Sequence, residues 1–345
     1  MSSSTAPAAS AATAMLLVGT STAVSATIAD YPVLSGQALR YALAAAILLT
    51  VVRHQRLPRA GLTPRDFLLL AALAATGLAG FNIFLVEATR HASPAMIGTI
   101  VGAIPIVLAL VGPLAQRRRP AARIVGAGVV VTLGAAVATG LGGGSLHGAL
   151  LSIGALVGEV AFSLLALPLL PKLGALRVAA YPAALSVPLL LAASIALDGT
   201  NSLRLPAPSE AAAFGYLGAV VTATAFFLWY DALRRLGADR AGLFAGLVPI
   251  GALLTSVTLG LGEAGPADIA GALLVAAGVG IGLRQPAPSN RAHRAVSPVR
   301  QASGQRAGRY SGPGAQRYSG TAVQRLVGSH VEVSRIQRMS PAPDH

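Results

Sequence analysis

Residues 88–110 read ATRHASPAMIGTIVGAIPIVLAL and residues 232–254 read ALRRLGADRAGLFAGLVPIGALL, and the two stretches align without a gap at an offset of 144. Seven of these 23 positions are identical, and the same offset also pairs Glu87 with Asp231. Self-similarity at a fixed offset indicates a duplicated structural unit. The identities that matter most below are Gly98 with Gly242, Gly102 with Gly246 and Pro105 with Pro249.

The duplicated unit is a set of apolar helices. The 345 residues are 54% hydrophobic and 11% charged, whereas a typical soluble domain is about 25% charged. A helix needs about 20 mostly apolar residues to cross a bilayer. Ten segments qualify: 11–29, 33–52, 67–87, 93–115, 121–140, 147–168, 177–197, 211–230, 240–261 and 267–284. The first segment is interpreted as a retained helix, because no Lys or Arg precedes it as in a signal peptide.

Basic residues are distributed unevenly over the loops between these segments. One set of alternate loops holds thirteen Lys and Arg residues, and the other set holds only Arg90 and Arg204. Since basic loops stay in the cytoplasm, both termini are predicted to be cytoplasmic, in a multi-pass protein of the cytoplasmic membrane. Five spans per copy is an odd number, so the second copy is inverted. The predicted fold is all-α, with ten transmembrane helices as two inverted five-helix repeats at 11–140 and 147–284.

Residues 285–345 differ in composition, being rich in Ser, Gly, Pro, Ala and Arg. They are predicted to form a basic, disordered cytoplasmic tail. Their arginines are scattered, which favours an unconstrained tail over a binding segment for anionic lipid. The net charge of +14 therefore lies in loops and tail and predicts no nucleic-acid partner.

Cofactor and metal signatures are missing from the sequence. There is no cysteine, no Gly-x4-Gly-Lys-Ser/Thr loop and no His-Glu-x-x-His motif, and the six histidines are scattered over loops and tail. We expect no cofactor and no metal.

Ionisable residues inside a bilayer are costly and are candidates for function. Glu159 lies in the middle of the sixth span, where its carboxylate is expected to bind a proton or a substrate ammonium; the alternative is a structural partner for an Arg or for a neighbouring helix. Arg40 in the second span is interpreted mainly as a snorkelling or structurally paired side chain, with binding of a substrate carboxylate as the alternative. The further candidates for the substrate or proton pathway are Asn82, Ser21, Ser25, Ser163 and Thr224.

Three further features have structural interpretations. Each Gly-Gly-Pro set, Gly98, Gly102 and Pro105 or Gly242, Gly246 and Pro249, follows an i, i+4, i+7 pattern, which predicts close helix packing or a hinge. The pairs Glu87 with Arg90 and Asp231 with Arg234 are predicted to be local ion pairs or charges at the edge of a gate, outside the central site. Trp229 and Tyr230 end the eighth segment and are predicted to anchor it at the membrane interface.

The whole pattern resembles the ten-helix EamA-type members of the drug/metabolite transporter superfamily. The resemblance covers residues 11–284 and rests on Leu39-Arg40, on Glu87 to Pro105-Ile106, on Asp231 to Pro249-Ile250 and on Gly262-Glu263. It differs from the family in having Val18-Gly19 where a Trp-Gly pair is common, and Arg119 where a Glu is common. The resemblance implies export or exchange of amino acids, other metabolites or toxic compounds without ATP.

The sequence thus predicts a secondary transporter rather than an enzyme, because inverted repeats are typical of secondary transporters. Its expected partners are a small-molecule substrate, the lipid bilayer and protons. A homodimer is allowed, although no helix face identifies its interface. The alternatives are a membrane-embedded lipid-modifying enzyme, which needs a cluster of catalytic groups, and a non-transporting receptor or scaffold.

Overall fold

The computed structural model describes residues 5–56, 61–140, 142–261 and 263–284. The predicted tail at 285–345 lies outside these residues, as do Arg59 and Gly262. The helices below all belong to one compact unit, Met1–Pro286.

Each half of the unit is built from five spans. In the first half these are α1 (Thr5–Ala26), α2 (Val33–His54), α3–η1–α4 (Pro64–Ala72, Leu73–Gly80, Phe81–Thr89), α5–α6 (Pro94–Val101, Ile104–Ala115) and α7 (Ala122–Thr139). In the second half they are α8 (Leu146–Leu164), α9 (Leu170–Asp198), α10–η3–α11 (Pro208–Tyr216, Leu217–Thr224, Ala225–Leu236), α12–η4–α13 (Ala238–Ala241, Gly242–Leu247, Val248–Thr258) and α14 (Pro266–Leu283). A short 3-10 turn, η2 (Thr200–Ser202), follows α9. Within the described residues, ten helices are long and apolar enough to cross a membrane, which confirms the predicted number.

The structural boundaries recur at the offset found in the sequence. The segments α3, η1 and α6 begin at residues 64, 73 and 104, and their counterparts α10, η3 and α13 begin at 208, 217 and 248. Both η1 and η3 are π-helical turns, wider than an α-helix. The described part of the chain is therefore all-helical in two five-span repeats, and the odd number of spans inverts one repeat relative to the other.

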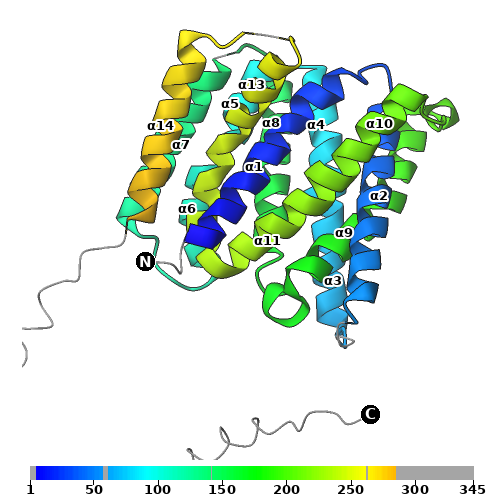
Figure 1. The fold of residues 1–345 in the computed structure, drawn as a ribbon, viewed down its shortest axis with the longest axis horizontal. Helices are drawn as coiled ribbons and strands as arrows, with labels where there is room; N and C mark the ends of the chain where they lie inside the picture. Colours follow the sequence, from blue (N-terminus) through cyan, green and yellow to red (C-terminus); the bar gives the residue numbers. More distant parts are fainter. Residues whose placement is uncertain (1–4, 57–60, 141, 262, 285–345) are drawn as a thin grey trace, which may run out of the picture. The chain divides into compact units, whose positions relative to one another are not determined.

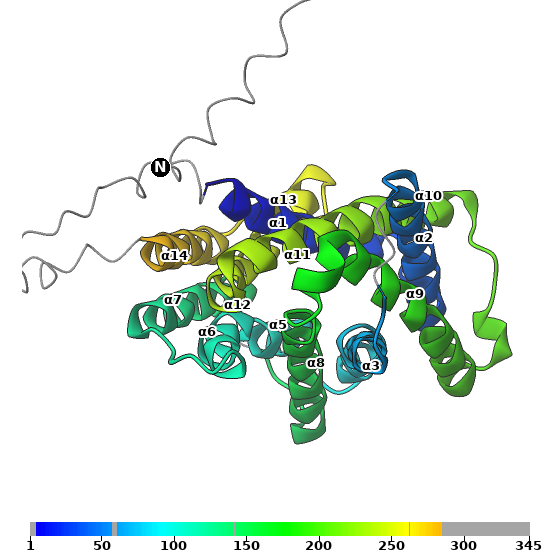
Figure 2. The same ribbon diagram turned by 90° about the horizontal axis from the view of Figure 1, so that it is seen from below.

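The repeats interlock through their first helices. Helix α1 packs against α11 and α13 of the second repeat, and its counterpart α8 packs against η1, α4 and α5 of the first. Figure 2 shows the two groups in opposite rows, with α1, α11 and α13 in one and α8, α3 and α5 in the other. Two further close contacts between the repeats join counterparts directly, α2 with α9 and α7 with α14 (Figure 1).

Local sequence signals set several helix starts. Proline occupies the first turn of α3, α5, α10 and α14, where its missing N–H breaks no helical bond. The side chains of Thr63, Ser93 and Ser145 accept hydrogen bonds from the first turns of α3, α5 and α8. Such caps satisfy backbone donors that lipid cannot.

Glycine allows the interlocking helices to approach closely. A Cβ on Gly19 of α1 would lie 2.2 Å from the carbonyl oxygen of Val248, and a Cβ on Gly251 of α13 would lie 2.3 Å from that of Leu16. Only the absence of a side chain permits this backbone contact, as is typical of membrane helix interfaces.

The Gly-Gly-Pro sets lie at interruptions of the fourth and ninth spans. Residues 102–103 separate α5 from α6, and the 3-10 turn η4 separates α12 from α13; Pro105 and Pro249 then occupy the first turn of the next helix. Gly246 also packs closely, since a Cβ there would lie 2.2 Å from Val131, whereas Gly98 has its nearest neighbour, Thr139, at 3.3 Å. Gly242 packs closely as well, since a Cβ there would lie 2.7 Å from Leu108. A hinge role for these residues stays a prediction.

The predicted interface anchors are wrong. Trp229 and Tyr230 are 3% and 0% exposed and belong to the main hydrophobic core. The reason is that α11 continues to Leu236, six residues past the predicted end of the span, so both aromatic side chains lie inside the bundle.

We predict that Gly19→Ala lowers the thermal stability of the purified protein in detergent, by about 1–3 kcal/mol, because the added methyl group overpacks the contact of α1 with α13. The matched control is Gly280→Ala in α14, where a Cβ would meet nothing within 4 Å. Equal melting temperatures for Gly19→Ala and the native chain would contradict the close contact.

Candidate functional site

A polar cluster joins both repeats inside the bundle. From α2, the Nε of Arg40 donates to Thr222 Oγ1 of η3 at 2.5 Å, and its Nη1 lies 3.4 Å from Gln37 Oε1. The next residue, Tyr41, accepts a hydrogen bond from Asn82 Nδ2 of α4 at 3.0 Å. Asn82 also donates to the carbonyl of Leu78 at 2.8 Å, so both amide hydrogens have partners. The cluster therefore ties three spans together through neutral partners.

Arg40 has no carboxylate within 4.0 Å among the described residues, and Thr222 and Gln37 are its hydrogen-bond partners there. The structural pairing predicted for Arg40 is thus made with a neutral hydroxyl and a neutral amide rather than with a carboxylate. The guanidinium therefore has no acidic counter-ion in the described part of the chain.

Glu159 of α8 also lies near Tyr41. It is partly exposed, and within the described residues its carboxylate has neither a hydrogen bond nor an ion pair. It lies close enough to Tyr41 and Tyr230 to interact with both electrostatically, and Arg40 reaches Tyr41 in the same way. Tyr41 is thus the residue that both charged groups share. The alternative of a structural Arg partner for Glu159 finds no such partner in the described structure.

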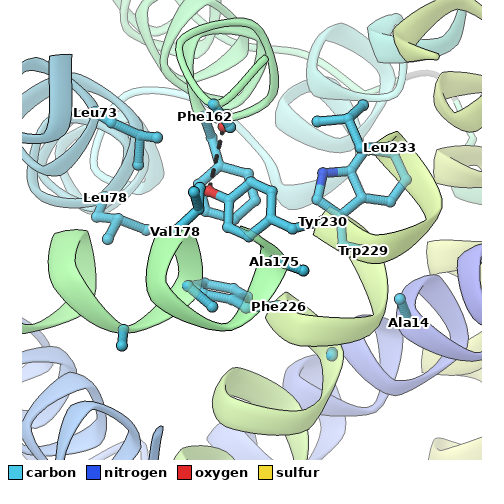
Figure 3. Packing of buried hydrophobic residues seen from close by; sticks show 14 of the residues in the cluster. Ala14, Leu73, Leu78, Phe162, Ala175, Val178, Phe226, Trp229, Tyr230 and Leu233 are labelled. Atoms are coloured by element: carbon cyan, nitrogen blue, oxygen red, sulfur yellow. Dashed lines mark hydrogen bonds between the residues drawn. The ribbon is translucent and has the colours of Figure 1, made fainter. Parts of the chain in front are cut away.

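Aromatic rings enclose this cluster. Phe162 lies 4.9 Å from Tyr230 and 4.8 Å from Phe226 between ring centroids, and Tyr41 lies 6.2 Å from Phe226. Figure 3 shows the Tyr230 hydroxyl donating to the carbonyl of Phe162, at 3.3 Å. Trp229 donates to the buried hydroxyl of Ser163 at 3.3 Å. Rigid aromatic walls with few polar groups are typical of small-molecule sites.

The sequence candidates are only partly brought together. Asn82, Arg40 and Glu159 share the cluster, and Ser163 lies one turn beyond Glu159 on α8. Ser21 bonds its own helix at Val18, at 2.6 Å. The hydroxyl of Thr224 donates to Ala219 of its own segment, and its side chain is exposed.

Ser25 of α1 is half-buried near the end of its helix. Within the described residues, neither it nor Ser21 nor Thr224 is hydrogen-bonded to Arg40, Asn82 or Glu159.

Sequence analysis missed Tyr41 and Thr222. Tyr41 follows Arg40 in a span that is otherwise apolar, and this adjacency was an available signal. Thr222 had no such signal in the sequence. The wide turn η3 directs its side chain toward α2, whereas the nearby Thr224 is exposed. Tyr230 was recognised, but was placed at the interface.

The predicted ion pairs at the helix ends are confirmed. Arg90 lies 3.6 Å from Glu87, and Arg234 lies 3.0 Å from Asp231. Both pairs are partly exposed, and such exposed pairs contribute only about 0–1 kcal/mol.

A cavity of about 490 Å³ opens at the end of the bundle where α2 ends and α3 begins, here called the arginine-rich end. Its polar lining is Arg65, Gln116 and Arg234, and its apolar lining includes Leu164, Leu167, Leu170 and Leu233. Glu159 lies five residues before Leu164 on α8, and Tyr230 three residues before Leu233 on α11. Glu159 and Tyr230 are therefore on two of the helices that line the cavity, about one turn from its lining residues.

The opposite end is closed at the repeat-related position. Thr20 of α1 and Tyr216 of α10 are hydrogen-bonded at 2.9 Å, and the Tyr31 ring packs edge-on against Phe214 with centroids 4.9 Å apart.

Arg204 completes this closure from the loop between α9 and α10. It lies over the ring of Tyr31, 4.4 Å from its centroid, and donates two hydrogen bonds to Glu210, at 2.8 and 2.5 Å. Within the described residues, the arginine-rich end thus has a cavity, and contacts between α1, α10 and the neighbouring loop hold the opposite end together.

Within the described residues no group of three or more His, Asp or Glu side chains could hold a metal ion. The site's chemistry rests on two opposite charges, two phenols, an amide and hydroxyls.

A ten-span bundle of inverted repeats with a charged cluster beyond a one-sided cavity defines a multi-pass membrane protein of the transporter class. The chain belongs to the EamA-like transporter family, which matches residues 6–140 and 146–283. It is 25% identical over 256 residues to a protein of Bacillus subtilis (strain 168) described as the uncharacterized transporter YetK, covering 72% of this chain and 77% of that one. Transporters are generally not enzymes.

The fold is also similar to that of a solved crystal structure described only as that of a protein. The TM-score is 0.70 at 19% identity, over 82% of this chain and 98% of the other. This likeness concerns the fold alone.

We predict that a single cysteine replacing Leu167, in the cavity lining, reacts rapidly with a water-soluble maleimide. A cysteine at Ala23, its counterpart 144 residues earlier, is expected to react slowly, because that residue is 3% exposed in the closed end. The chain has no native cysteine, so no background removal is needed. Leu205→Cys, at a residue that is 91% exposed, gives the reference rate; equal rates at positions 167 and 23 would refute the one-sided opening.

Proposed function

We propose that the chain is a secondary transporter of the cell membrane that exports small metabolites such as amino acids or drug-like compounds, in exchange for protons. The single observation that carries this proposal is the carboxylate of Glu159, which has no ionic or hydrogen-bonded partner in the described structure and lies just beyond the cavity. A charge left unpaired inside a membrane is costly, and a ligand that pairs it recovers much of that cost.

The two charges favour an amino acid over an uncharged drug-like compound. Arg40 and Glu159 have opposite charges, stand on different repeats and are not paired with each other, while both reach Tyr41. A small zwitterion has the matching groups, with its carboxylate for Arg40 and its ammonium for Glu159. The leucine-lined cavity that precedes the cluster suits an apolar side chain.

Exchange follows from competition for one carboxylate. Glu159 binds either the ammonium of the substrate or a proton, so the arrival of one releases the other. Such competition at a single site couples the two fluxes when the cavity opens alternately to the two sides of the membrane. This gives Glu159 both roles that its position in the sixth span suggests.

The proposed direction of transport is supported by the proposed orientation. The arginine-rich end is proposed to face the cytoplasm, because basic loops are retained there, and both termini then lie on that side. The cavity accordingly opens inward, ready to load substrate from the cytoplasm. A lipid-modifying enzyme or a receptor is less well supported, since the family consists of transporters and neither role needs a one-sided cavity between inverted repeats.

We predict that cells producing the native chain accumulate one class of metabolites outside, and that Glu159→Gln reduces this export at least tenfold at equal membrane levels. The substitution keeps the shape but removes the charge. The control Glu263→Gln changes an exposed loop carboxylate and should export like the native chain. Equal export by Glu159→Gln and native cells would make Glu159 structural, and no export by native cells would reject the exporter.

The orientation has its own test. In intact cells, the cysteine of Leu205→Cys is expected to react with a membrane-impermeant maleimide, and that of Leu167→Cys only after the cells are opened. The reverse pattern would invert the proposed topology and leave the fold unaffected.

A further inference from the structure

The guanidinium of Arg40 is held in the cluster by a turn of unusual geometry. The π-helical turn η3 lies against α2, and a Cβ on Gly218 would come within 2.8 Å of Leu43. One turn further along, Thr222 is 0% exposed and its hydroxyl donates to the carbonyl of Leu217, five residues back, at 2.9 Å. A threonine in an α-helix bonds three or four residues back instead.

This bond fixes the direction of the hydroxyl. Because its hydrogen is engaged with Leu217, the oxygen of Thr222 presents its lone pairs to Arg40, whose Nε donates to it at 2.5 Å. The wide turn, the close glycine contact and the hydroxyl therefore act as one unit. π-Helical turns within longer helices are frequent at functional sites.

Without this acceptor, Arg40 has an alternative position. It lies seven residues after the start of α2, about 10 Å along the helix, and its long side chain can extend toward the nearer membrane surface. The other partner, Gln37, lies on the side of that surface and at the longer distance of 3.4 Å. Thr222 is the partner that draws the guanidinium inward.

We propose that Thr222 is a positioning residue that sets selectivity for substrates with a carboxylate, by holding Arg40 in the cluster. This rests on the proposed function, in which Arg40 meets the substrate carboxylate. The residue lies in the second repeat and acts on a charge of the first, so the recognition of one substrate group depends on the contact of η3 with α2.

The test measures binding to the purified full-length chain through the fluorescence of Trp229, the one tryptophan in the sequence. This ring is buried and bonded to Ser163 beside the cluster. The probes are leucine and leucinamide, which differ only in that the amide replaces the carboxylate with a neutral group. Hydrogen bonds to charged groups are worth enough for a change of about tenfold or more in affinity.

Thr222→Val and Arg40→Gln are each expected to raise the Kd of leucine about tenfold. Thr222→Val is expected to leave the Kd of leucinamide within about twofold of the native value. Thr222→Ser keeps the hydroxyl and should bind leucine like the native chain. The control is Thr76→Val in η1, the counterpart turn, where the exposed side chain donates only to Ala72 of its own helix.

Two results would overturn the proposal: an unchanged Kd for leucine in Thr222→Val, or an equal loss for leucine and leucinamide, which indicates a merely structural role. If Thr222→Val does not fold, Thr222→Ala is measured in the same way. If the native chain binds no leucine, the same variants are compared in the export assay. The proposal then expects Thr222→Val to lower the export rate as much as Arg40→Gln. An export rate of Thr222→Val equal to that of the native chain would refute the proposal. If the native chain exports nothing, the proposed function itself is rejected, and this result distinguishes that failure from a failure of the role proposed for Thr222.

Discussion

A chain that crosses a bilayer must satisfy its backbone N–H and C=O groups within the protein, because lipid offers no hydrogen bonds. This constraint gives ten helices, and it also explains how they meet. Lipid tails are as apolar as the side chains, so burying apolar surface between helices gains little. The helices therefore associate through close packing. Gly19 and Gly251 bring α1 against α13 at distances that exclude any side chain. The interlocking of the two repeats depends on such contacts, and the position of every charged group in the cluster depends on the interlocking.

The duplication accounts for the frame of the molecule and not for its site. Helix boundaries and both π-helical turns recur at an offset of 144 residues, yet the counterparts of Glu159, Arg40 and Asn82 are Met15, Ala184 and Phe226. Each of these three polar residues thus corresponds to an apolar residue in the other repeat. A symmetric frame supplies two equivalent ways of packing, which alternating access requires. The unsymmetric side chains place a single set of charged groups within it, as the proposed function requires of one site that serves both sides of the membrane.

The sequence predicted the frame well because hydropathy, basic loops and the repeat are all long-range averages over many residues. Within the site it identified Glu159, Arg40 and Asn82, since polar residues inside apolar spans are conspicuous. It missed Thr222 because the direction of that side chain depends on one extra residue in a helical turn, which no local pattern in this chain marks. It misplaced Trp229 and Tyr230 because the charged end of α11, with Asp231 and Arg234, suggested a helix end that the structure places six residues later. Averages survive small errors in helix boundaries, whereas side-chain directions change by about 100° for each residue.

The conformation that the structure adopts also follows from side chains that differ between the repeats. At one end, Thr20 meets Tyr216, and Arg204 bonds Glu210 over the ring of Tyr31. At the repeat-related end, the counterpart of Thr20 is Leu164, which lines the cavity, and the counterpart of Tyr216 is Ala72. A leucine and an alanine cannot form the hydrogen bond that joins Thr20 to Tyr216. The arginine-rich end has contacts of its own between the repeats, the ion pairs of Lys172 with Asp66 and of Arg118 with Asp239. In the proposed function, a substrate that meets both Arg40 and Glu159 would draw α2 and α8 together, and this added attraction, rather than the frame, would have to offset the contacts that hold the opposite end.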